Sequence, residues 1–168
     1  MTTVSVPYPG PEPRHVSLVA LPDAVVSTLS GIYDVMNAFT VMGVAHSAAA
    51  RHPPFRVEIV GETAGPLGLA SGVPIDVQRP VDEIASSDIV IVPSVLLGAN
   101  RWAKDRYPVL VDWLRRMHDR GAVLCSACSG IFLLAETGLF DRRDATVHFG
   151  YAASFAETHP SVRIHPEQ

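Results

Sequence analysis

Val123-Leu-Cys-Ser-Ala-Cys-Ser-Gly130 decides the fold of this chain, and Ile131-Phe-Leu-Leu-Ala-Glu-Thr-Gly138 follows it directly. The first stretch begins as the apolar run of a buried strand and ends in small residues, while the second has the apolar pattern of a helix that stops at a glycine. A strand that turns at once into a helix presents the side chain at its corner, here Cys128, to the free N–H groups of the helix start. The stretch therefore predicts a nucleophile elbow with Cys128 at its tip.

Strand-like and helical segments alternate along the rest of the chain. The pattern predicts strands over 15–21, 55–61, 89–93 and from 123. It predicts helices over 25–49 with an interruption near Gly31, and over 108–120, 131–137 and 151–158. Shorter pieces are an edge hairpin over 65–79, helical turns over 81–86, a turn over 139–145, an extended piece over 146–149 and a strand over 162–164. This alternation predicts an α/β fold, a three-layer α/β/α sandwich with a mostly parallel, flavodoxin-like sheet.

Composition narrows the class of protein. The chain has 168 residues, 48% hydrophobic and 18% charged, which suits one domain with a buried core. We expect residues 1–14 to be a flexible leader and 15–168 to be the domain, in a cytoplasmic protein without a membrane span. A formal charge of -4 without a Lys/Arg cluster argues against direct DNA binding by this chain. Two cysteines make no disulfide framework, and no spacing indicates a metal or another cofactor.

Four segments together resemble the ThiJ/PfpI family of the class I glutamine amidotransferase-like superfamily. They are the first strand with Pro22, the strand that ends at Pro93, the elbow with its helix, and Ala145-Thr-Val-His148-Phe. The resemblance implies that Cys128 is the nucleophile and His148 its partner. Other members also have an acid near the first helix and a Pro-Gly-Gly turn whose backbone N–H contributes to an oxyanion hole.

Two departures from that pattern argue against catalysis. Thr28 stands where the acid is expected, and the nearby Asp23 and Asp34 are out of register. Ser94 and Val95 stand where the two glycines are expected. Loss of one oxyanion donor raises a reaction barrier by about 3 kcal/mol. We therefore expect the site to bind a ligand without turning it over.

The same departures occur in one branch that the chain resembles, the amino-terminal domains of AraC-type transcriptional regulators. That resemblance implies a ligand-sensing or dimerisation domain, a homodimer, a small-molecule ligand, and DNA contact only through a C-terminal domain absent from this chain. It also implies a last strand and helix that the chain lacks. The residues expected to line the ligand site are Cys128, Ser129, Ser94, Val95, Thr28, Asp23 and His148.

Two alternatives remain open. The first is a cysteine-dependent enzyme using Cys128 and His148, such as an isocyanide hydratase, a glyoxalase-like enzyme or an amidase, for which rapid alkylation of Cys128 is expected. The second is an oxidation sensor at Cys128. Cys125 is expected in the core rather than in a redox pair. Trp102 and Tyr107 suit either an aromatic pocket wall or simple packing. The remaining histidines are expected to be solvated or to cap helices: His15, His46, His52, His118, His159 and His165.

Overall fold

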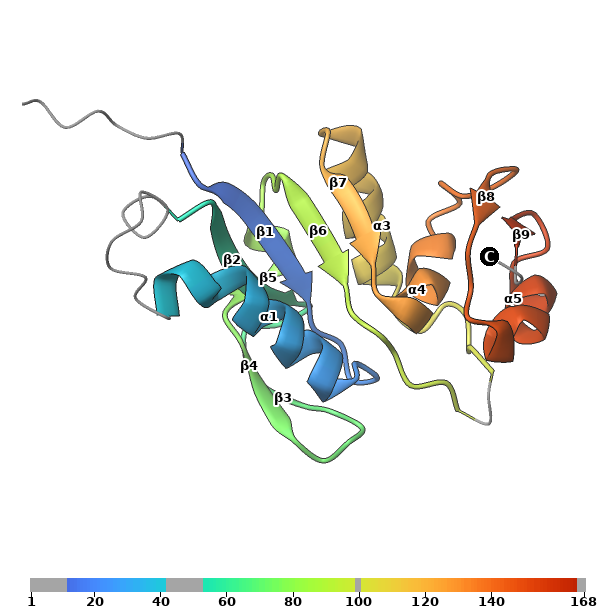
Figure 1. Ribbon diagram of the computed structural model, residues 1–168, viewed down its shortest axis with the longest axis horizontal. Helices are drawn as coiled ribbons and strands as arrows, with labels where there is room; N and C mark the ends of the chain where they lie inside the picture. The colour runs from blue at the N-terminus through green and yellow to red at the C-terminus, as the bar shows by residue number, and fades with distance from the viewer. Residues whose placement is uncertain (1–11, 42–52, 99–100, 166–168) are drawn as a thin grey trace, which may run out of the picture.

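The structure is a computed structural model that describes residues 12–41, 53–98 and 101–165. Its centre is a five-stranded sheet in the order β5-β2-β1-β6-β7 (Figure 1). The strands are β1 (Arg14–Val19), β2 (Phe55–Gly61), β5 (Arg79–Pro80), β6 (Ile89–Val92) and β7 (Val123–Ser126). All four pairings are parallel, as the alternating pattern predicts.

The burial of each strand follows its place in the sheet. The central strand β1 is buried at every position after Arg14, because it has a strand on each side and helices over both faces. β7 forms one edge of the sheet, and none of its four residues is fully buried. The elbow therefore follows the strand that is least covered.

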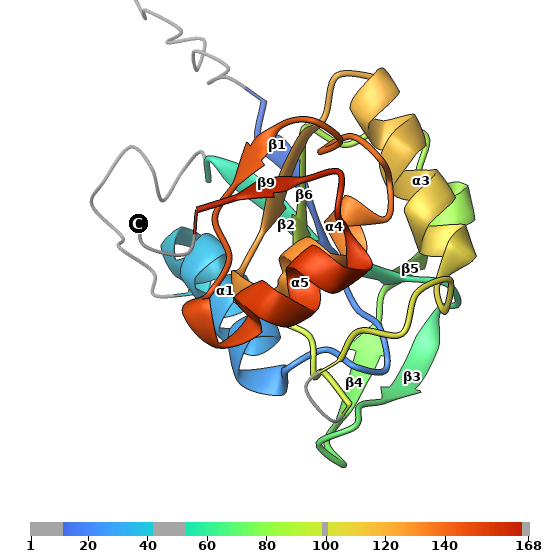
Figure 2. The same ribbon diagram turned by 90° about the vertical axis from the view of Figure 1, so that its right-hand side faces the viewer.

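Helices cover both faces of the sheet. The crossover through α1 (Val26–Val41) leads from β1 toward one edge, and the crossover through α3 (Pro108–Asp119) leads from β6 toward the other. Right-handed crossovers in opposite directions place these helices on opposite faces, and Figure 2 shows them on the two sides of the sheet. The predicted three-layer sandwich is confirmed. The described helix α1 runs unbroken through Gly31, and the predicted helical residues beyond 41 lie outside the described residues.

The core is made by the apolar stripes of these elements. α3 directs Leu110, Trp113, Leu114 and Met117 inward, with Pro108 at its first position. The short helix α4 (Ile131–Ala135) follows the elbow and is buried at all five positions. It lies so deep because α3 covers one side of it and the C-terminal segments cover another (Figure 2).

The shorter segments differ in detail from those that the sequence predicts. The predicted hairpin forms its own two-stranded sheet from β3 (Gly65–Gly68) and β4 (Pro74–Val77), and the turns at 81–86 contain the short helix η1 (Val81–Glu83). In the predicted turn over 139–145, β8 (Asp144–Ala145) pairs in parallel with β9 (Arg163–Ile164). The expected extended piece over 146–149 instead leads into η3 (Phe149–Tyr151) and α5 (Ala152–Thr158).

Within the described ranges 12–41, 53–98 and 101–165, no helix combines the length and the apolar character needed to cross a bilayer.

Candidate functional site

The elbow has the geometry that its small residues predict. Ala127 is extended, and Cys128 follows with a φ of 47°, a left-handed conformation that is strained for a residue with a side chain. A short helix η2 (Cys128–Gly130) then leads into α4. A Cβ atom on Gly130 would lie 2.5 Å from the Pro93 carbonyl oxygen and 2.6 Å from that of Val92. Gly130 thus lets the elbow pack directly against the end of β6.

Cys128 is exposed at the tip of this elbow and lines a cavity of about 720 Å³. One wall is the outer side of β7 with Leu124 and Ser126, and the floor comes from α4. The far wall is residues 144–149, which include His148. The structure therefore places the predicted nucleophile and its predicted partner in one cavity, large enough for a small organic molecule.

His148 is held in one tautomer by its own backbone. Its Nδ1 accepts the Gly150 N–H at 3.1 Å and caps η3, and its ring stacks on Phe149 at 4.4 Å between centroids. An Nδ1 that accepts a hydrogen bond carries no proton, so the neutral ring is protonated at Nε2. His148 is accordingly prepared to donate a hydrogen bond rather than to accept a proton at Nε2.

Ser129 points away from the cavity into the protein. It is buried, and its Oγ accepts the Val95 N–H at 2.9 Å and donates to the Val95 carbonyl at 2.7 Å. The two main-chain groups of Val95 are therefore both engaged. A backbone N–H that already donates to a buried hydroxyl is not available to stabilise an oxyanion without breaking that bond.

The crevice between β1 and β6 is closed by main chain. Ala24 and Val95 form an antiparallel bridge, in which Val25 donates to the Ser94 carbonyl and Leu96 to the Asp23 carbonyl, both at 2.8 Å. This crevice is the switch point of the sheet, where ligands of such folds usually bind. Ser94 and Val95 are buried there and do not line the 720 Å³ cavity.

Two other predicted ligand residues lie elsewhere. The Asp23 carboxylate pairs with Arg106 and accepts a hydrogen bond from the Tyr107 hydroxyl at 2.8 Å. Burial, followed by this bond to Asp23, raises the pKa of Tyr107. Thr28 donates to the Val25 carbonyl at 2.8 Å, within the first turn of α1. Neither residue lines the cavity that contains Cys128.

Of the two aromatic residues singled out in the sequence, Trp102 has a packing role, while Tyr107 lines a second cavity of about 180 Å³ together with Arg106 and Leu110. Trp102 is buried between the rings of Tyr107 and Phe132, with centroids 6.2 and 6.1 Å away, and its Nε1 donates to the Glu136 carboxylate. Cys125 is half-buried on β7 and, like Cys128, is a free thiol. These side chains stabilise the surroundings of the elbow rather than line its cavity.

Sequence reasoning missed three residues that line the cavity. Phe140, Asp144 and His165 line it, although no motif marks them. Hydrogen bonds from Arg163 and His165 hold the pKa of Asp144 well below its usual range. This carboxylate is therefore ionised and already paired. Only the Ala145-Thr-Val-His148 motif predicted that this part of the chain contributes to the site.

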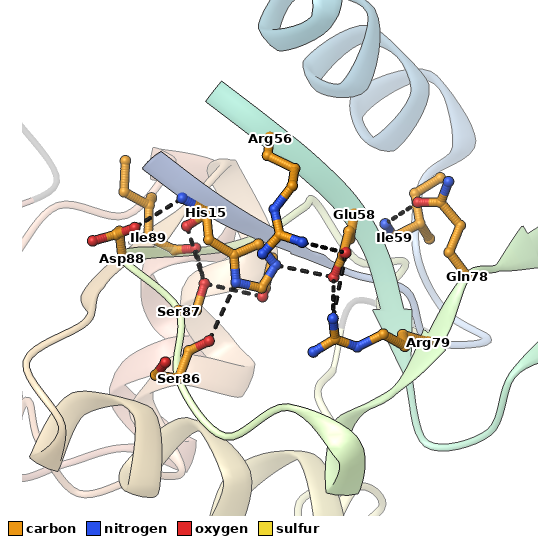
Figure 3. Close-up of polar contacts among 11 residues, drawn as sticks. His15, Arg56, Glu58, Ile59, Gln78, Arg79, Ser86, Ser87, Asp88 and Ile89 are labelled. Atoms are coloured by element: carbon orange, nitrogen blue, oxygen red, sulfur yellow. Dashed lines mark hydrogen bonds and ion pairs between the residues drawn. The ribbon is translucent and has the colours of Figure 1, made fainter. Parts of the chain in front are cut away.

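The expectation of solvated or helix-capping histidines is wrong for His15, which is buried on β1, whereas His159 is buried but stands at the C-cap position of α5. His15 is 8% exposed, with Nδ1 3.2 Å from the Ser86 carbonyl and Nε2 3.0 Å from the Glu58 carboxylate (Figure 3). Both ring nitrogens of His15 therefore have an oxygen atom within hydrogen-bond distance. Figure 3 also shows Arg79 on the same carboxylate, at 3.1 Å. The cluster joins β1, β2 and β5 at the end of the sheet opposite the elbow.

His159 is buried against aromatic rings. It is 5% exposed, stacks on Phe155 at 5.0 Å between centroids, and approaches the Thr158 hydroxyl through Nδ1 at 3.0 Å. Burial, with a smaller contribution from Lys104, lowers the pKa of His159 to about 4. The ring is therefore neutral at pH 7. His118 and His165 are exposed as expected, while His46 and His52 lie outside the described residues.

Comparison with known proteins finds relatives of this chain. The model of the DJ-1/PfpI family matches residues 33–162. The HTH-type transcriptional regulator CdhR of Pseudomonas aeruginosa is 26% identical over 113 residues, which are 67% of this chain and 32% of that protein. The chain thus spans about a third of the length of this curated relative.

Solved structures share the fold at low sequence identity. An AraC family transcriptional regulator from Pseudomonas putida superposes with a TM-score of 0.70 at 19% identity, over 92% of this chain and 77% of that one. A candidate transcriptional regulator from Vibrio parahaemolyticus gives 0.76 at 20% identity, over 94% and 78%. Drosophila melanogaster DJ-1beta gives 0.69 at 17% identity, over 93% and 75%.

Proposed function

Because this chain belongs to the DJ-1/PfpI family, we propose that it is the ligand-sensing domain of an AraC-type transcriptional regulator and catalyses no reaction. In support, an HTH-type transcriptional regulator is a relative of this chain, and an AraC family transcriptional regulator shares its fold. In this proposal the cavity beside Cys128 binds a small organic molecule, which Cys128 and His148 contact. Ser129, Ser94 and Val95 support the elbow from behind. DNA recognition lies outside residues 1–168, in a helix-turn-helix segment, and the domain works as a homodimer in the cytoplasm.

The hydrogen bonding between Ser129 and Val95 is the main observation in support of the proposal that this chain catalyses no reaction. In a cysteine-dependent acyl transfer, backbone N–H groups beside the nucleophile must be free to bind the developing oxyanion. Here the Val95 N–H donates to a buried hydroxyl at 2.9 Å. His148 adds a second argument, since its Nδ1 is occupied and its Nε2 carries the proton. The cavity retains its space and its hydrogen-bond donors, which suffice for binding.

A thermal-shift screen of small aldehydes, amides, carboxylates and amines tests this proposal. A true ligand raises the melting temperature of the wild-type chain and loses this effect in Cys128→Trp, whose indole occupies the part of the cavity next to the elbow. The effect persists in Thr28→Val, a control on α1 outside the cavity. NMR of the same mixtures reports turnover. A compound consumed by the wild type but not by Cys128→Ala would contradict the proposal and favour the enzyme.

The enzymatic alternative rests on one observation, the strained and exposed Cys128 in the same cavity as His148. Strain of this kind is often found at functional positions. An enzyme of this type would consume substrate with Cys128 as nucleophile, so the NMR readout separates the two functions.

A further inference from the structure

A second cavity, of about 180 Å³, lies beyond the carboxyl ends of β1 and β2. Residues 20–22, which follow β1, and residues 62–63, which follow β2, form one side of it. Leu67 and Val77 of the β3–β4 hairpin and Leu110 of α3 form the other side. In open α/β sheets, ligands bind beyond this end of the strands. The second cavity therefore lies where this kind of fold places a ligand.

This cavity is remote from the β7 edge. β2 and the β3–β4 hairpin lie toward one edge of the sheet, while β8, α5 and β9 lie beyond β7 at the other (Figure 1). The residues that line it all differ from those that line the cavity beside Cys128. The second cavity is thus formed by elements from β1 to the start of α3.

The interior of the second cavity is small and apolar. Leu21, Val77 and Leu110 belong to the buried core, and each turns part of its surface to this space. Cavities for drug-sized ligands have volumes of about 300–1,000 Å³, so this one suits a molecule with only a few heavy atoms. An apolar surface favours a short aliphatic group on that molecule.

Arg106 lines the cavity with a guanidinium group that is already ordered. Both of its terminal nitrogens donate to the Asp23 carboxylate, and the group lies over the Tyr107 ring, 5.1 Å from the centroid. Each terminal nitrogen carries a second hydrogen. The side chain is 44% exposed and can therefore be reached by a ligand. An ordered guanidinium with donors to spare is suited to bind a carboxylate.

Glu62 brings the opposite charge to the same cavity. Its carboxylate is exposed, while the residue lines the cavity together with Arg106. The negative charge of Glu62 disfavours a simple anion, and the positive charge of Arg106 disfavours a simple cation. A molecule that carries both charges meets an opposite charge at each end. Electrostatic complementarity therefore selects a zwitterion.

We propose that the second cavity binds a small zwitterion, an α-amino acid with a short aliphatic side chain. The carboxylate of the amino acid accepts hydrogen bonds from Arg106, and its ammonium group donates to Glu62. The aliphatic side chain enters the apolar interior beside Leu110. This inference adds a second binding site to the chain and does not depend on the proposed ligand sensing at Cys128.

An NMR titration of the full chain tests the inference. The probe is L-valine, and two analogues each lack one charge: 3-methylbutanoate has no ammonium group, and 2-methylpropylamine has no carboxylate. We expect L-valine to shift the amide signals of Thr63, Leu67 and Tyr107 and to bind at least tenfold more tightly than either analogue. L-tryptophan, whose indole exceeds the space, is expected to leave these signals unchanged.

Charge variants assign each end of the ligand. Glu62→Gln is expected to weaken binding of L-valine about tenfold and to leave 3-methylbutanoate bound no more weakly than before. Arg106→Gln is expected to weaken L-valine similarly without weakening 2-methylpropylamine. Because Arg106→Gln also loses the pair with Asp23, its folding is checked by circular dichroism, and Glu62→Gln at an exposed position decides the test if it does not fold. Glu83→Gln and Arg116→Gln, at exposed positions outside the cavity, are the matched controls.

A further variant separates this site from the cavity at the elbow. Cys128→Trp is expected to leave the affinity for L-valine unchanged, because Cys128 does not line the second cavity. Four results would overturn the inference: no shifts around the second cavity with L-valine, equal affinity for L-valine and an analogue, full affinity in Glu62→Gln, or loss of binding in Cys128→Trp.

Discussion

The hydroxyl of Ser129 bridges the two main-chain groups of Val95, accepting from the N–H at 2.9 Å and donating to the C=O at 2.7 Å. It ties the elbow after β7 to the loop after β6. The same loop is bridged to Ala24 in the loop that follows β1. One buried side chain thus connects the tip that bears Cys128 to the closed crevice of the sheet.

Ser129→Ala is expected to lower the free energy of unfolding by about 2 kcal/mol, because it leaves two buried main-chain groups without a partner. Urea denaturation followed by circular dichroism measures the change. Ser71→Ala at an exposed turn is the control and is expected to change stability by less than about 0.5 kcal/mol. Equal effects of the two substitutions would show that the Ser129 bridge contributes nothing.

Gly130→Ala is expected to lower the free energy of unfolding by about 3 kcal/mol or to prevent folding. The new Cβ would lie 2.5 Å from the carbonyl oxygen of Pro93 and 2.6 Å from that of Val92. Gly31→Ala is the matched control. Its Cβ would meet nothing within 4 Å, in the interior of α1, and the substitution is expected to stabilise the chain by about 0.5–1 kcal/mol. Melting temperatures of both variants provide the measurement, and a Gly130→Ala protein as stable as wild type would contradict the close packing.

Cys128 is expected to react with iodoacetamide well before Cys125, because Cys128 is exposed in the cavity and Cys125 is half-buried on β7. Peptide mass spectrometry after short exposures gives the two rates. Cys125→Ser controls for cross-reaction and should leave the rate at Cys128 unchanged. Preferential modification of Cys125 in the folded chain would mean that the elbow does not expose its tip.

His159 is expected to make stability depend on pH. Its pKa is lowered to about 4 in the folded chain, while the ordinary value is 6.5. The unfolded chain therefore takes up the proton first, so the stabilisation is complete above pH 6.5 and is lost as pH falls toward 4. The loss is on the order of 2–3 kcal/mol at pH 4.

His159→Phe keeps the aromatic stacking on Phe155 and removes the titration. Its free energy of unfolding, measured in urea at pH 7 and pH 4, is expected to fall less than that of the wild type. His118→Phe, at an exposed position on α3, is the control and should retain the wild-type slope. Parallel pH profiles for wild type and His159→Phe would show that another group is responsible.

The local sequence pattern was sufficient to predict the fold and to place Cys128 at the tip of the elbow. Apolar runs of strand length and 3.6-residue periodicity are set by neighbouring residues, so the strands around β1 and the helix α3 could be read directly. The glycine and small residues around Cys128 likewise predict its corner, and the resemblance of Ala145-Thr-Val-His148 to the family's motif implies its partner. The structure places both side chains in one cavity.

The sequence by itself therefore determined the alternating α/β order, the elbow and the departures at Thr28, Ser94 and Val95. Only the tertiary structure decided that Ser129 engages Val95, that the crevice at the switch point is closed, and that the open cavity lies along β7 instead. Only the tertiary structure also showed that His15 and His159 are buried. The physical reason is that these features depend on contacts between segments far apart in the chain, and the residue types at each position allow several such contacts.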